Sequence, residues 1–288
     1  MAEITSSLVK DLREKTGLGM MQCKKALEET AGDIEKAIEH LRKQGAQVAA
    51  KRMGREAKEG RILFVRNQEA VVAVEVNCET DFVTASADFA QFGEKIASII
   101  LTEKPENLES LKQKKYDSKT VEQANTDIVA KIGENIGVRR FVIENQSSQE
   151  YCSTYSHGGG KIGVLVKLSS SAPLAQPAVL EELGKELAMQ IAATFPLAID
   201  PSGIAPEILS KEKEIAREQT LAEGKPANIV DKIVEGRMAK YYKDVCLLQQ
   251  QFVKDSSITV QAHIAAVAKQ LQISDLKVAS FHRLQLGQ

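Results

Sequence analysis

The stretch LVKDLREKTGLGMMQCKKAL, residues 8–27, decides how the chain begins to fold. Leucines recur in it at helical spacing (Leu8, Leu12 and Leu27), but Thr16-Gly17-Leu18-Gly19 interrupts the pattern. The interruption predicts two short helices joined by a glycine turn. A third helix is expected after a turn and cap at Gly32-Asp33, because an apolar stripe follows, formed by Ile34, Ala37, Ile38 and Leu41. Three helices in about 50 residues form a bundle near the lower size limit for independent folding.

The second of these helices starts with two adjacent methionines, Met20 and Met21. Filling of the core is the ordinary role of such residues, but two neighbours on a helix cannot both point inward. We therefore expect at least one exposed methionine. A flexible thioether beside a glycine turn is a suitable contact for another protein.

The composition of the 288 residues is ordinary for a globular protein, with 43% hydrophobic residues, 27% charged residues and a net charge of −1. This length predicts two or three domains, and the charge gives no overall basic field for nucleic acid. Met1-Ala2-Glu3-Ile4 lacks a basic head before an apolar run, so we expect no signal peptide; we also expect no membrane span. The widely spaced cysteines favour reduced thiols in a cytoplasmic protein over a disulfide framework or a structural zinc site: Cys23, Cys78, Cys152 and Cys246.

Residues 47–61 are polar and basic, which predicts a solvated linker or an exposed helix. Contact with RNA is the alternative for this segment, but it contains no aromatic residue on which bases could stack.

An α+β unit is expected to follow the linker. Two β-rich runs, 62–65 and 70–76, flank Asn67-Gln68-Glu69 and predict a β-hairpin. Three valines of the second run alternate with Ala73 and Glu75, which predicts one buried face. Further elements are expected as helices over an apolar stripe from Phe89 to Ile100, over 108–115 and over 121–132, and as a strand over 139–143.

The unit recurs further along the chain. Strand-like runs at 151–155 and 161–168 flank His157-Gly158-Gly159-Gly160, which we interpret as a turn because no nucleophile elbow accompanies it. A shift of 91 positions places the stripe of the first helix, with its Gly93, on a second helix that carries Gly184 and the apolar residues Leu180, Leu183, Leu187 and Ile191. Ile128–Ile132 similarly resembles Ile229–Ile233. We predict two copies of one α+β unit.

The second copy contains an insertion. Residues 206–222 and 227–242 are charged helical stretches joined by Glu223-Gly224-Lys225-Pro226, which predicts a helical hairpin. Its few apolar positions either pack together or face a partner: Ile208, Leu209, Ile215, Leu221, Ile229 and Ile233. The common catalytic and nucleotide-binding motifs are missing from the sequence, and we expect neither an enzyme nor a cofactor or metal site.

The segment Thr80-Asp81-Phe82-Val83 follows the strand that ends at Asn77. Spacing alone favours Phe82 as a core aromatic residue and Asp81 as a turn or cap residue. The alternative is a wedge, in which a carboxylate and a rigid ring on a turn push into a partner. The carboxylate would disturb a bound Mg²⁺, and the ring would shift packed helices in steps.

Five motifs together resemble the translation elongation factor Ts family: residues 8–27, EVNCETDFV (75–83), KIGENI (131–136), HGGGKIGVLV (157–166) and GKPANIVDKIVEGRM (224–238). The resemblance covers the chain from Met1 to about Leu286. It implies an α+β fold with an N-terminal, ubiquitin-associated-like (UBA-like) three-helix bundle over residues 1–54, followed by two related core subdomains. These span 55–144 and 145–205 with 243–288, and the helical hairpin 206–242 is inserted in the second.

The resemblance implies guanine-nucleotide exchange on elongation factor Tu. The residues that match partner-binding positions of the family are Leu12, Met20, Met21, Thr80, Asp81, Phe82, Val83, Ile132, His157, Phe252 and Val253. Among them, residues 80–83 match the segment that dislodges Mg²⁺ from elongation factor Tu. The sequence departs from the family at Gln250-Gln251-Phe252-Val253-Lys254, where members often have Gln-Pro-Phe-Val-Met. The chain ends at Gln288 without the C-terminal helical module of some members, so we expect the interface to lie on the core and the N-terminal bundle.

Two alternatives stay open at this stage. The N-terminal bundle alone could be a general peptide-binding module, and the basic stretch could make the chain an RNA-binding accessory of translation. Neither explains the position of Asp81 and Phe82. The resemblance also allows a homodimer within a two-plus-two complex with elongation factor Tu.

Overall fold

The computed structural model describes residues 4–288, apart from the side chain of Ala227. The expectation of no signal peptide rests partly on residues 1–3, which lie outside the described residues. The chain divides into two compact units. Unit 1 contains the residues up to Ile143 together with Gly159–Lys161 and Gln285–Gln288, and unit 2 contains Glu144–Gly158 and Ile162–Leu284. Both helices and sheets are present, so the fold is α+β.

The predicted N-terminal helices are confirmed as α1 (Ser6–Thr16), α2 (Met20–Glu29) and α3 (Ile34–Arg52). The hydroxyl of Thr5 caps α1 by accepting from the Leu8 N–H (3.3 Å), and α1 ends at Gly17 with a left-handed backbone. As predicted, Asp33 caps α3, and its carboxylate accepts from the Lys36 N–H at 3.1 Å. The bundle has its own small core, formed by Val9, Leu12, Cys23, Ala26, Leu27, Ala37 and Leu41.

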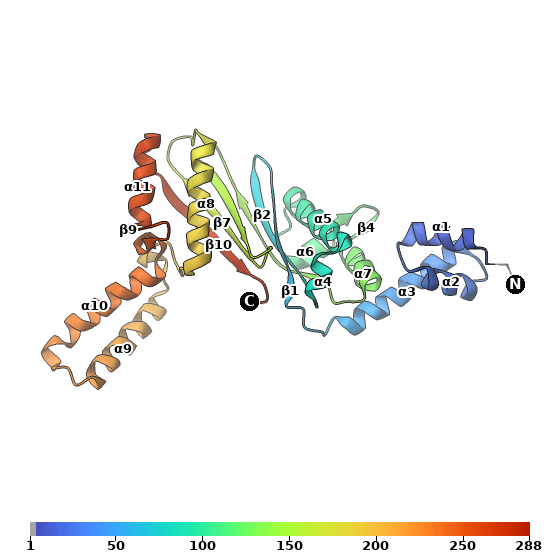
Figure 1. The fold of residues 1–288 in the computed structure, drawn as a ribbon, viewed down its shortest axis with the longest axis horizontal. Coiled ribbons are helices and arrows are strands. Elements are labelled where there is room, and N and C mark those ends of the chain that lie inside the picture. Colours follow the sequence, from blue (N-terminus) through green and yellow to red (C-terminus); the bar gives the residue numbers. More distant parts are fainter. Residues whose placement is uncertain (1–3) are drawn as a thin grey trace. The chain divides into compact units, whose positions relative to one another are not determined.

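The rest of unit 1 is a three-stranded sheet with helices (Figure 1). Its elements are β1 (Glu59–Arg66), β2 (Ala70–Cys78), α4 (Asp81–Thr84), α5 (Ala87–Glu103), α6 (Leu108–Lys112), β3 (Lys115–Tyr116), β4 (Lys119–Thr120), α7 (Val121–Ile132) and β5 (Gly137–Asn145). The strands lie in the order β1-β2-β5, and β1 pairs antiparallel with β2, with Leu63 opposite Val74. The core forms where α5 and α7 bury their apolar stripes, together with Val72, Val74 and Val76 of β2.

The prediction of one buried face for β2 is wrong, because every residue of this strand is buried. Glu75 is 0% exposed although it is charged. Its carboxylate accepts from Arg140 Nε (2.7 Å), from the Asn77 side chain (3.2 Å) and from the Gly287 N–H (3.2 Å). A buried carboxylate is tolerated when it is paired and hydrogen-bonded in this way.

Unit 2 repeats this arrangement and contains β6 (Glu150–His157), β7 (Ile162–Ser169), α8 (Pro177–Thr194), α9 (Pro206–Ala222), α10 (Ala227–Val245), β8 (Gln251–Phe252), β9 (Asp255–Thr259), α11 (Val260–Leu271), β10 (Lys277–Gln285) and two short 3₁₀ helices, Pro201–Gly203 and Leu247–Gln249. The order β6-β7-β10 matches β1-β2-β5 of unit 1. The turn of the β6–β7 hairpin has positive φ at Gly158, Gly159 and Gly160, in line with its interpretation as a turn.

The predicted repeat is confirmed for the hairpins and for α5 and α8, and the two glycines have the same role. A Cβ on Gly93 would lie 2.4 Å from Leu63 Cδ1, and a Cβ on Gly184 would lie 2.1 Å from Ser153 Oγ. Each glycine therefore lets its helix approach the first strand of its hairpin.

The predicted match between Ile128–Ile132 and Ile229–Ile233 is wrong. The second segment lies in α10 of the inserted hairpin, whereas α11 is the counterpart of α7. Both α7 and α11 follow a two-stranded ribbon and are capped by a threonine, Thr120 or Thr259, that comes before a buried valine. Both also precede the third strand of their sheet. The five-residue likeness misled because isoleucine spacing is common to many amphipathic helices.

The inserted helical hairpin is confirmed as α9 and α10, which run side by side (Figure 1). Its own core is formed by Ala216, Val230, Val234 and Met238. Of the six apolar residues that were expected either to pack together or to face a partner, three are exposed: Ile208, Leu221 and Ile229. Within the described residues, no helix combines the length and the apolar character needed to cross a membrane.

Candidate partner-binding site

The segment 80–83 presents an aromatic ring to solvent. Phe82 lies on α4, a single helical turn, and its side chain is 86% exposed. Val83, next to it, is buried and packs into the core of unit 1. The prediction from spacing that Phe82 is a core residue is wrong, because on this one turn Val83 takes the inward position. Val83 was also predicted to contact the partner, but its buried side chain anchors α4.

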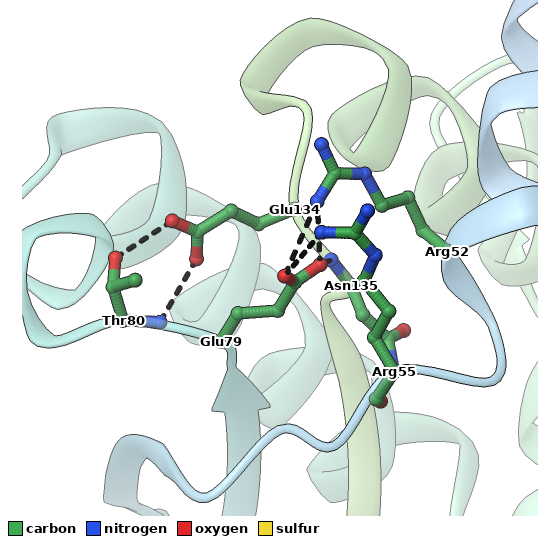
Figure 2. Close-up of polar contacts among 6 residues, drawn as sticks. All are labelled: Arg52, Arg55, Glu79, Thr80, Glu134 and Asn135. Carbon is green, nitrogen blue, oxygen red and sulfur yellow. Dashed lines mark hydrogen bonds and ion pairs between the residues drawn. The ribbon is translucent and has the colours of Figure 1, made fainter.

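The residue before α4 is held by a carboxylate from a distant loop (Figure 2). Glu134, which follows α7, accepts hydrogen bonds from the Thr80 N–H (3.0 Å) and from the Thr80 hydroxyl (2.6 Å). The Cys78 thiol donates to the Thr80 carbonyl at 3.1 Å. Burial, with the nearby charge of Glu134, raises the pKa of Cys78 to about 12, so this thiol stays protonated. All polar groups of Thr80 are thus engaged.

A second carboxylate, Glu79, ties the end of β2 to the same loop (Figure 2). It accepts from the Asn135 N–H (2.7 Å), from Arg52 at 3.2 Å and from Arg55 at 3.4 Å. Burial acts to raise the pKa of Glu79, but the hydrogen bonds from Asn135 and the two arginines outweigh it and lower that pKa below its ordinary value. The Asn135 side chain also donates to the Arg55 carbonyl at 2.8 Å.

These contacts give the basic stretch 47–61 a structural role. Its first part continues α3 as far as Arg52, and both Arg52 and Arg55 pair with Glu79. The helix α7 ends at Gly133 in a left-handed conformation (φ 83°), which turns the chain toward Glu134 and Asn135. Only glycine adopts this conformation freely, so the turn that delivers Glu134 depends on it.

The N-terminal patch is exposed in part. Met20 and Met21 are 54% and 74% exposed, so both methionines, rather than at least one, are available to a partner. Leu12 is fully buried in the core of the bundle. In this structure Leu12 supports the bundle from within, and its contact with a partner stays a prediction.

The remaining predicted residues differ in exposure. Ile132, at the end of α7, is half-buried and packs against the core of unit 1. In unit 2, His157 is exposed at the hairpin turn, and its ring lies 3.1 Å from the Tyr155 hydroxyl.

Phe252 is buried and stacks on His263 with ring centroids 4.2 Å apart, and its contact with a partner stays a prediction. Val253 beside it is half-exposed, and its N–H donates to Gln190 at 2.8 Å. In this segment Phe252 is the anchor and Val253 is the exposed residue.

Two histidines of unit 2 form ion pairs with glutamates. His263 contacts Glu186 and His282 contacts Glu144, each at 2.7 Å. Among the residues that the structure describes, no three His, Cys, Asp or Glu side chains are grouped so that they could hold a metal ion. All four cysteines are buried.

Sequence reasoning missed the roles of Glu79, Glu134 and Asn135. They lie in motifs that were recognised, EVNCETDFV and KIGENI, but no local pattern pairs Thr80 with a residue 54 positions away. Their positions could have indicated these roles, because Glu79 follows the end of a predicted strand and Glu134 follows the end of a predicted helix.

Comparison with known proteins identifies the family of the chain. A family model described as Elongation factor TS matches residues 79–288. An elongation factor Ts of Chloroherpeton thalassium is 47% identical over 294 residues, which cover 100% of both chains. That of Clostridium kluyveri is 44% identical over 290 residues, covering 99% of this chain and 93% of the relative. That of Prosthecochloris aestuarii is 43% identical over the full length of both chains. The chain therefore belongs to the elongation factor Ts family of translation elongation factors.

Proposed function

We propose that this chain is a guanine-nucleotide exchange factor for elongation factor Tu. It binds the GDP form, displaces Mg²⁺ and promotes GDP release during translation elongation in the cytoplasm. It acts by binding and breaks no bond itself. The observation that supports this most directly is the exposed ring of Phe82, which stands beside Asp81 on a short, well-anchored turn.

The energetics require more than one contact. A protein that prefers the nucleotide-free partner must weaken nucleotide binding by the same factor by which nucleotide weakens its own binding. Acceleration of release by several orders of magnitude needs differential binding of about 4 kcal/mol or more. We therefore propose a two-part interface in unit 1. Met20 and Met21 anchor the partner, while Asp81 and Phe82 enter near its nucleotide and Mg²⁺.

We also propose partner contacts from exposed residues of unit 2. His157 at the hairpin turn and Val253 at the β8–β9 turn offer a polar and an apolar contact. Three predicted residues are buried and support the interface by fixing the residues around them: Leu12, Val83 and Phe252.

The test is release of labelled GDP from elongation factor Tu at increasing concentrations of this chain. We expect Phe82→Ala to slow release about 30-fold, the effect of losing a central interface aromatic. Circular dichroism and melting temperature should stay unchanged, because the ring is exposed. Phe195→Ala is the matched control, since Phe195 is an exposed phenylalanine of unit 2, 51% accessible. Equal release rates for the Phe82→Ala variant and the wild type would remove the wedge role.

A further inference from the structure

Two glutamates of unit 1, Glu134 and Glu79, hold the chain just before the exposed ring of Phe82. Glu134 accepts from the N–H and from the hydroxyl of Thr80, at 3.0 and 2.6 Å (Figure 2). These two bonds fix the backbone and the side chain of the residue from which α4 starts. Glu79, the neighbour of Thr80, is held in turn by Arg52 and by the Asn135 N–H.

The helical turn that carries Phe82 is not stable on its own. It is four residues long, and the first turn of a helix costs more conformational freedom than its hydrogen bonds return. Within α4, the buried side chain of Val83 fixes the chain to the core, and the Val83 carbonyl accepts from the Ser86 N–H at 3.0 Å. Before α4, Glu134 holds the N–H and the hydroxyl of Thr80, and the Cys78 thiol donates to its carbonyl at 3.1 Å. The ring therefore sits between one anchor in the core and one anchor in a loop.

We infer that Glu134 is a positioning residue for nucleotide exchange, holding Thr80 so that α4 presents Phe82 outward before the partner arrives. The inference rests on the proposed function, because Glu134 acts only through Phe82. An exposed ring on an ordered backbone loses less conformational freedom on binding than a ring on a mobile loop. The energy saved is available to distort the nucleotide site of the partner.

Two substitutions at Glu134 separate its hydrogen bonds from its charge. Glu134→Ala removes both acceptors from Thr80. Glu134→Gln keeps both contacts without the charge, because the amide oxygen accepts from the Thr80 N–H and the amide nitrogen donates to the hydroxyl. Glu106→Ala is the matched control, since Glu106 is an exposed glutamate of unit 1 in the connection between α5 and α6.

The experiment measures GDP release from elongation factor Tu over a range of exchange-factor concentrations. For Glu134→Ala we expect the maximal release rate to fall about tenfold, as for loss of an ordering contact, with the half-maximal concentration changed less than about twofold. Glu134→Gln and Glu106→Ala should stay within about twofold of the wild type in both quantities. Hydrogen exchange of residues 79–86 should accelerate in Glu134→Ala alone, with the melting temperature of the chain unchanged.

The double variant Glu134→Ala/Phe82→Ala decides whether the effect passes through the ring. If it does, the double variant releases GDP as slowly as Phe82→Ala, within about twofold. Multiplied losses, a lower melting temperature of Glu134→Ala or a wild-type rate in that variant would each overturn the inference. If the wild-type chain does not accelerate GDP release, the proposed function is refuted. If only Phe82→Ala has no effect, the wedge role of Phe82 is refuted, whereas slow release in Phe82→Ala beside normal release in Glu134→Ala refutes only the positioning role.

Discussion

The two units differ at one equivalent place, the connection from the second strand to the long helix. In unit 1 this connection contains α4 and turns Phe82 to solvent. In unit 2 it is the irregular segment 170–176, which turns its apolar residue Leu174 toward the core. The Ser171 N–H is fixed there by Asp275 at 2.7 Å. The sheets and helices that bury the core are retained in both copies, and the connection is where unit 1 carries the exposed ring that we propose as part of its interaction surface.

The largest effect we predict tests a partly buried cluster of charged and polar side chains in unit 2. Glu144 accepts from His282 (2.7 Å), Lys167 (2.7 Å) and Ser280 (2.8 Å). The hydrogen bond from His282, with those from Lys167 and Ser280, lowers the pKa of Glu144 to about 2 against the effect of burial. A lowered pKa stabilises the folded state above the ordinary pKa of the carboxylate, and this stabilisation is lost as pH falls from about 4.5 to about 2.

We expect unit 2 to lose up to about 3 kcal/mol of stability over this acidic range. Hydrogen exchange of β7 and β10 amides as a function of pH measures the loss. In Glu144→Gln, which cannot titrate, this part of the pH dependence should disappear. Its persistence would assign the acid sensitivity to other carboxylates.

The next effect sharpens the comparison of the two helix glycines. A Cβ added at Gly184 meets the Ser153 side chain, including its Cβ at 2.4 Å, and Ser153 is completely buried on β6. A Cβ added at Gly93 comes too close only to the end of the Leu63 side chain, which can rotate away, while Val76 Cγ2 lies at an ordinary contact distance of 3.8 Å. We expect Gly184→Ala to cost about 2 kcal/mol and Gly93→Ala less than about 1 kcal/mol.

Thermal unfolding of both variants, with hydrogen exchange to localise the loss, measures this difference. Ser153→Gly in the Gly184→Ala background should restore part of the stability, because it removes the clashing atoms. Equal losses in the two alanine variants would contradict the view that unit 2 is packed more tightly at this point.

The smallest effect concerns the anchor of unit 1. Met20 is the first residue of α2, where an acidic side chain is favoured by the helix dipole, so Met20→Asp should leave the bundle folded. It places a charge in the proposed apolar contact, and we expect affinity for elongation factor Tu to fall about fivefold, or about 1 kcal/mol. Titration calorimetry measures the affinity, with Met53→Asp as the control because Met53 is also exposed. Unchanged affinity would remove Met20 from the interface.

The regular elements followed from local signals in the sequence. The glycine turn at 17–19, the cap at Asp33 and the apolar stripe that includes Phe89 and Ile96 each predicted a helix that is present. These signals suffice because they lie within one or two turns of the residues they control.

The candidate site could not be predicted in the same way. Periodicity cannot decide which of two apolar neighbours on a four-residue helix turns inward. Spacing therefore assigned Phe82 to the core, and only the family resemblance implied that it is exposed to a partner. The pairing of Thr80 with Glu134 spans 54 positions, and that of Glu75 with Gly287 spans 212. Alternation along β2 carries no information on such distant donors.

The pairing of Glu75 with Gly287 has a consequence for biogenesis. The ribosome exposes β2 long before it reaches the residues near Gln285, yet unit 1 includes that late segment. A nascent chain can therefore pair Glu75 with Asn77 and, later, with Arg140, but it obtains the Gly287 donor only after residues 76–287 have been made. Domains usually fold in the order in which they are synthesised. Unit 1 departs from this order, because most of it is made first but it is completed only when residues 285–288 arrive.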